Sequence, residues 1–155
     1  MSRIHSLLPR LAFVVAPIVV ALLAGAFLWW KRPYVVPASE SIFDVVAGRW
    51  AWVDDDDRCT HHWHDISFSR DHQVMTIANS EPYENSDGKL DSLAVYDIRE
   101  HTPSWIRAMM RGEQRLTEDS QLVIWDLVLR SRDRYAWHRT DWPFGGFTRP
   151  IERCP

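Results

Sequence analysis

The sequence has few of the residues that common catalytic and phosphate-binding motifs require. Its 155 residues include only two cysteines, two lysines and six glycines. The one glycine pair, Gly145 and Gly146, is an isolated turn and not a phosphate-binding loop. Neither the Gly-x-Ser-x-Gly pattern of α/β-hydrolases nor the His-Glu-x-x-His pattern of zinc proteases occurs. We therefore predict that the protein is not an enzyme and uses no cofactor.

Acidic residues are absent from the first 32 positions, and all 21 of them follow Pro33. Residues 33–155 hold 14 arginines and lysines, so this part of the chain carries a net charge of −7. Proteins that bind nucleic acids need a basic surface for the phosphates. The charge therefore excludes nucleic acid as a partner. The length fits one domain, and the 46% of hydrophobic residues is ordinary for a folded protein.

Residues 11–30 form the one long apolar run, and no charged residue interrupts it. A helix of this length rises about 30 Å, which is the thickness of the hydrocarbon core of a bilayer. Trp29 and Trp30 end the run, and indole rings favour the headgroup region. The run predicts a single transmembrane helix at residues 11–30, after a cytoplasmic tail at residues 1–10.

A cleaved signal peptide is the alternative explanation of this run. Arg3 and Arg10 would supply its basic region, and the small residues at 24–26 would supply the cleavage site. We favour an uncleaved anchor because the apolar run continues beyond that site and a Lys-Arg pair follows it. No cysteine follows the run closely, which excludes a lipoprotein anchor.

The two cysteines, Cys59 and Cys154, are 95 residues apart and both follow the apolar run. Cys154 lies in a terminal tail without histidine, and such a tail needs a tether, so we predict a disulfide; free thiols or a metal site are the alternatives. In the chain-entropy model, this bridge would stabilise the fold by about 4–5 kcal/mol. Disulfides form in oxidising compartments. With the excess of arginine over lysine, typical of a GC-rich bacterial genome, this predicts a bacterial inner-membrane protein with its C-terminal domain in the periplasm.

Beyond a linker at residues 31–47, short apolar runs alternate with polar residues and end at turn residues, as in antiparallel strands. The runs cover residues 49–53, 63–69, 73–78, 90–101, 121–129 and 135–138. Seven or eight antiparallel strands must cover or remove their edges, and closure into an up-and-down barrel removes them. The sequence therefore predicts a mainly β fold, with a closed antiparallel barrel over residues 48–155.

Two segments of the domain allow more than one structure. Ser39 or Ser41 could cap a short helix that Gly48 ends. Residues 102–112 fit either a helix or a strand, and we prefer a strand that runs on to Thr117 because the apolar run at 121–129 needs a partner.

Gly48, Arg49 and Trp50 open the first predicted strand. This Gly-x-Trp resembles the motif that begins the barrel of lipocalins and their calycin relatives. The resemblance covers the strand order over residues 48–140 and implies a membrane-anchored, lipocalin-like barrel with an apolar ligand cavity. It also implies that a basic residue packs over Trp50, and Arg139, just past the last predicted strand, is the candidate.

Aromatic residues are the candidates for contact with a ligand or a partner. Most tryptophans of the domain are expected in the core. The candidate contact residues are Trp50, Trp105, Trp142, Phe144 and Phe147. The leading hypothesis is a membrane-anchored, non-enzymatic binding module for a small apolar ligand or an envelope protein partner. The alternative is an accessory subunit of a membrane complex, with a solid barrel.

A third hypothesis is a metal-binding module built on His61, His62 and His64. On a strand, His62 and His64 would share a face and could ligate zinc or copper. No third well-placed ligand is evident, so we predict no metal site. The four aspartates at residues 54–57 do not fit a calcium loop either, because Cys59 stands where that loop needs glycine.

Overall fold

The computed structural model describes residues 32–53, 59–84, 88–143 and 145–155. The transmembrane helix predicted at 11–30 and the tail at 1–10 lie outside the described residues. In the described part, no helix has the length and apolar character needed to cross a membrane. Residues 33–155 form one compact unit.

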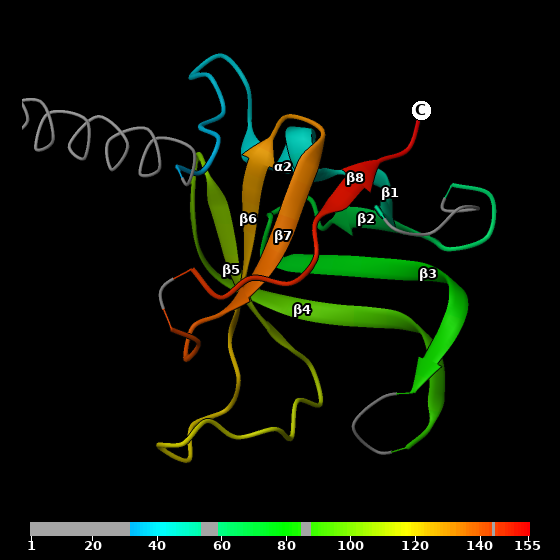
Figure 1. The fold of residues 1–155 in the computed structure, drawn as a ribbon, viewed down its shortest axis with the longest axis vertical. Coiled ribbons are helices and arrows are strands. Elements are labelled where there is room, and N and C mark those ends of the chain that lie inside the picture. The colour runs from blue at the N-terminus through cyan, green and yellow to red at the C-terminus, as the bar shows by residue number, and fades with distance from the viewer. Residues whose placement is uncertain (1–31, 54–58, 85–87, 144) are drawn as a thin grey trace, which may run out of the picture. The chain divides into compact units, whose positions relative to one another are not determined.

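Eight antiparallel strands form a closed barrel, which confirms the predicted mainly β, up-and-down fold (Figure 1). Each strand pairs with the next along the chain, and the last pairs with the first. The strands are β1 (Gly48–Trp52), β2 (Trp63–Phe68), β3 (Val74–Glu84), β4 (Leu90–Thr102), β5 (Trp105–Met110), β6 (Trp125–Ser131), β7 (Arg134–Arg139) and β8 (Ile151–Arg153).

A short helix, α2 (Ile42–Val46), precedes the barrel and confirms the helix predicted before Gly48. The Ser41 hydroxyl caps it by accepting a hydrogen bond from the amide of Phe43. Its apolar residues are buried. Phe43 packs against Phe68, His72 and His101 around the β2–β3 and β4–β5 turns. The helix therefore covers one end of the barrel, which we call the closed end.

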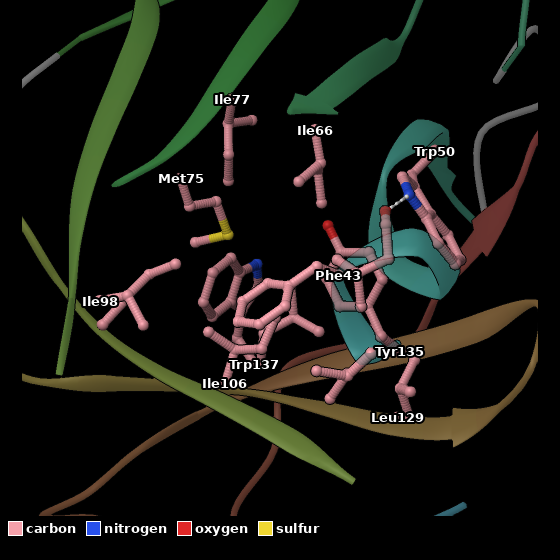
Figure 2. Close-up of a cluster of buried hydrophobic side chains, with 14 of the residues drawn as sticks. Phe43, Trp50, Ile66, Met75, Ile77, Ile98, Ile106, Leu129, Tyr135 and Trp137 are labelled. Carbon is pink, nitrogen blue, oxygen red and sulfur yellow. Dashed lines mark hydrogen bonds between the residues drawn. The ribbon is translucent and has the colours of Figure 1, made fainter. Parts of the chain in front are cut away.

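Trp50 is fully buried near this end, and its indole nitrogen donates to the carbonyl of Val46 at 2.8 Å (Figure 2). The guanidinium of Arg153 lies 4.2 Å from the ring centroid and donates to the carbonyls of Ala47 and Val45. Gly48 has a φ of +121°, and a Cβ there would lie 3.0 Å from the Arg153 guanidinium. The residue at position 48 therefore has to be glycine.

The prediction that Arg139 packs over Trp50 is therefore wrong. Arg139 pairs with Asp141 at 2.8 Å and lies 5.9 Å from the ring of Trp142. Arg153 takes the place over Trp50 because β8, a strand that the sequence did not predict, returns along the free edge of β1 and places Arg153 opposite Trp50.

The predicted disulfide between Cys59 and Cys154 is present, with its Cα atoms 5.6 Å apart. It joins the β1–β2 loop to the residue that follows β8. Since β2 and β8 flank β1 on its two edges, the bridge connects both sides of the place where the sheet closes.

Several strand boundaries differ from the predicted ones. Residues 105–110 form a strand, as preferred, but it ends at Met110 and not at Thr117. Gly112, at a φ of +75°, turns the chain, and residues 115–123 form a small hairpin held by a bridge between Leu116 and Leu122. β6 consequently begins at Trp125, later than predicted.

The half of the barrel next to α2 is solid, because side chains fill it. Trp50, Tyr135, Met75, Ile106, Leu127 and Leu129 are all fully buried. Figure 2 shows side chains from α2 and from opposite walls of the barrel pointing toward one another. Burial of this kind is the main stabilising contribution in a domain of this size.

Candidate functional site

The half of the barrel away from α2 is hollow. Two adjoining cavities occupy it, one of about 600 Å³, which we call the outer pocket, and one of about 160 Å³, the inner pocket. The outer pocket is lined by Trp52, Tyr83, Glu84, Tyr96, Met110, Gln114, Arg115, Trp125, Trp137 and Thr148. The inner pocket is lined by Trp52, His64, Ile77, Asn79, Tyr83, Ala94, Tyr96, Trp137 and Ile151. Four aromatic residues, Trp52, Tyr83, Tyr96 and Trp137, belong to both linings, so the two pockets adjoin.

Strand alternation explains why this wall is aromatic. In β4, Ala94, Tyr96 and Ile98 are inward positions, and in β7 Tyr135 and Trp137 are. Tyr96 and Trp137 stack with ring centroids 5.6 Å apart and an interplanar angle of 19°. Trp125 meets Trp137 edge to face at 6.2 Å. These contacts fix the rings, so the cavity has preformed flat walls.

Charge at the cavity is confined to the outer pocket, where Glu84 and Arg115 lie. Arg115 is held by Glu113, to whose carboxylate its Nε and Nη2 atoms donate at 2.7 and 2.6 Å. The Glu113 side chain is 1% exposed. Burial opposes its ionisation, but the hydrogen bonds from the side chain and backbone of Arg115 lower the pKa of its carboxyl. Arg115 is thus a cation of fixed position beside Trp125.

His64 is the one ionisable imidazole in the inner pocket lining, and it is 7% exposed. Its Nε2 atom lies 2.6 Å from the hydroxyl of Tyr135. Burial lowers the pKa of His64 to about 4, although the nearby Asp65 acts in the opposite direction. The imidazole is therefore neutral at neutral pH, and the inner pocket carries no charge among its lining residues.

The structure separates the three histidines of the predicted cluster. His61 and His62 precede β2 and are exposed, and His62 lies 3.4 Å from Glu81. His64 points into the barrel, toward Tyr135. In the described part of the chain, no group of three or more His, Cys, Asp or Glu residues is arranged to hold a metal. The aspartates at 54–57 lie outside that part.

Of the aromatic residues predicted to contact a ligand or a partner, the four that the structure describes are not among the residues that line the two pockets. Trp50 is packed in the solid half. Trp105 alternates with the buried Ile106, lies outside the core, and has the Arg107 guanidinium 4.9 Å from its ring. Trp142 and Phe147 pack against His138, at 6.5 and 5.1 Å. Phe144 lies outside the described residues.

Sequence reasoning missed most of the lining. The inward positions of Tyr96 and Trp137 follow from strand alternation, which was available in the sequence. Tyr83 could not be found in this way because residues 79–89 have the composition of a loop, whereas β3 extends to Glu84. Arg115 lies in an irregular segment that no local pattern places near the barrel mouth.

No known family model, curated protein or solved structure matches this chain.

Proposed function

We propose that the protein is a membrane-anchored, lipocalin-like binding module that holds a small, mainly apolar ligand in the open half of its barrel. The observation that carries this proposal is the pair of adjoining pockets with a shared aromatic lining. Preformed concave sites with a few polar groups are typical of small-molecule binding. A barrel that served only as a structural subunit would have no need of this hollow half.

The proposed location is the periplasmic face of a bacterial inner membrane. The apolar run at residues 11–30 supports an anchor, and the disulfide supports an oxidising compartment. The function would then be to bind or present a ligand outside the cytoplasm, without chemistry on it.

An uncharged fluorescent probe tests the proposal. The full chain, in detergent and with detergent alone as the blank, is titrated with N-phenyl-1-naphthylamine. Saturable binding at one site per chain is expected. Ala94→Phe, which places a ring in the inner pocket, should weaken binding at least tenfold.

Val95→Phe is the matched control, because Val95 is the next residue on β4 and points out of the barrel. It should bind the probe as the wild type does. Equal binding by both variants, or no saturable binding by the folded wild type, would refute a cavity ligand. The accessory-subunit hypothesis would then be the stronger one.

A further inference from the structure

His64 of β2 lines the inner pocket and forms a buried pair with Tyr135 of β7, which lies behind it. Their atoms Nε2 and Oη are 2.6 Å apart, and Tyr135 is fully buried. The other residues that line the inner pocket include the aliphatic Ile77, Ala94 and Ile151 and one amide, Asn79. A buried polar pair next to a pocket sets a specific requirement for whatever fills that pocket.

The direction of the hydrogen bond follows from burial. The hydroxyl proton of Tyr135 needs an acceptor, and among the described residues the one acceptor bonded to it is Nε2 of His64. Burial raises the pKa of Tyr135, so its hydroxyl keeps its proton. Tyr135 therefore donates to Nε2. A neutral imidazole that accepts at Nε2 carries its proton on Nδ1.

This Nδ1–H group faces the inner pocket. It has no hydrogen-bond partner among the described residues. Yet none of the side-chain nitrogen and oxygen atoms in that part of the chain is both buried and unpaired. Nδ1 is thus accessible, and the open space that the buried His64 side chain borders is the inner pocket.

The rest of the inner pocket restricts the ligand further. The residues that line it include no Asp, Glu, Lys or Arg, and burial of a charge without a partner is costly. Its walls are the rings of Trp52, Tyr96 and Trp137, which favour a flat aromatic group. Its volume of about 160 Å³ is close to that of a protein cavity that binds benzene, about 150 Å³.

We propose, building on the ligand-binding function above, that the inner pocket receives a flat, uncharged aromatic group that carries a hydrogen-bond acceptor such as a carbonyl oxygen. His64 Nδ1–H donates to this acceptor. The remainder of the ligand lies in the outer pocket, and any charged group it carries stays near Arg115 and Glu84. Tyr135 acts as a positioning residue that fixes the tautomer of His64.

Two probes of nearly the same shape test the acceptor requirement. 2-Acetylnaphthalene has a carbonyl oxygen, and 2-ethylnaphthalene does not. Their affinities are measured for the full-length wild type and for the double variant His64→Leu/Tyr135→Phe, which removes both polar partners together and leaves neither unpaired. For each protein, the affinity for the acetyl compound is divided by the affinity for the ethyl compound. This ratio should be about three- to tenfold larger for the wild type than for the variant.

The outcomes separate this proposal from the general one. If both probes bind and the ratio is the same in wild type and variant, the His64 donor is refuted while the cavity function stands. If neither probe binds the folded wild type, the cavity function itself fails.

Nitrogen-15 NMR of the histidine rings provides a test that requires no variant. The His64 ring in the free wild type should have the shifts of the Nδ1–H tautomer. Addition of 2-acetylnaphthalene should move the Nδ1 resonance, and 2-ethylnaphthalene should move it far less. An Nε2–H tautomer, or equal shifts with both probes, would overturn the proposal.

Discussion

His64 links the stability of the barrel to pH. Its pKa is about 4 in the folded protein against an ordinary value of 6.5, so folding disfavours its protonated form. Because the pKa of His64 is lower in the folded state, its contribution to the free energy of unfolding is complete above pH 6.5. This contribution is lost as the pH falls from 6.5 toward 4. This residue, which lines the inner pocket, is therefore also a weak point of the fold in acid.

We expect the free energy of unfolding to fall by about 2 kcal/mol between pH 7.5 and pH 5 because of His64. Urea denaturation at the two pH values measures this loss. His64→Gln keeps a polar group next to Tyr135 but does not titrate, so the loss should be smaller in this variant by about the same amount. The same loss in both proteins would show that His64 is not a buried neutral imidazole.

Arg153 is the residue on which closure of the barrel depends most directly. It stacks on Trp50, donates to two carbonyls at the end of α2, and lies 3.3 Å from Asp133. Burial lowers the pKa of its guanidinium, yet it stays charged at any ordinary pH.

Arg153→Ala should lower the free energy of unfolding by about 2–3 kcal/mol, because it leaves those carbonyls unpaired and removes the contact with the indole. Thermal or urea unfolding measures the change. Arg99→Ala, at an exposed position on β4, is the control and should change stability by less than about 0.5 kcal/mol. Equal effects of the two substitutions would contradict the role assigned to Arg153.

At the scale of the element, the alternation of apolar and polar residues predicted most of the strands, and the pairing of the strands confirmed them. The inward and outward positions of β4 and β7, and the short helix capped by Ser41, could be predicted because each depends on a local pattern. β8 could not, because its three residues, Ile151 to Arg153, carry no alternation of their own and become a strand through pairing with β1 and β7. Without this strand, no local pattern places Arg153 beside Trp50, and Arg139 is the remaining candidate.

β6 carries one buried acidic side chain. Asp126 interrupts β6 and is buried, so a cation has to face it. Arg107 of β5, directly opposite in the sheet, donates to both carboxylate oxygens at 2.8 and 3.1 Å. Arg111, at the end of β5, pairs with Asp97 of β4.

The disulfide links the chain on the two sides of β1, next to β2 and β8. Replacement of both Cys59 and Cys154 by serine should lower the free energy of unfolding by about 4–5 kcal/mol, because the unfolded chain regains the entropy of a 95-residue loop. Chemical denaturation of the oxidised wild type and the variant measures the loss. A reducing agent should destabilise the wild type and leave the variant unchanged, and an effect of similar size on both would argue against the bridge.

At the scale of the whole molecule, the barrel is divided into a solid half and a hollow half. The sequence could predict closure, but it could not predict the cavity, because an internal volume is what remains after every side chain has packed. The solid half, with α2, Trp50 and Arg153, holds the strands in place. Because the strands are held there, the aromatic side chains of the hollow half can stay apart and leave the cavity open.

The most direct test of this division is a crystal structure of the protein with 6-bromo-2-acetylnaphthalene, in which the anomalous signal of bromine locates the ligand. The account predicts one bromine peak inside the barrel, among the rings of Trp125, Trp137 and Tyr96, with the acetyl group directed toward His64. A peak only on the outer surface, or a hollow half filled by its own side chains, would contradict it.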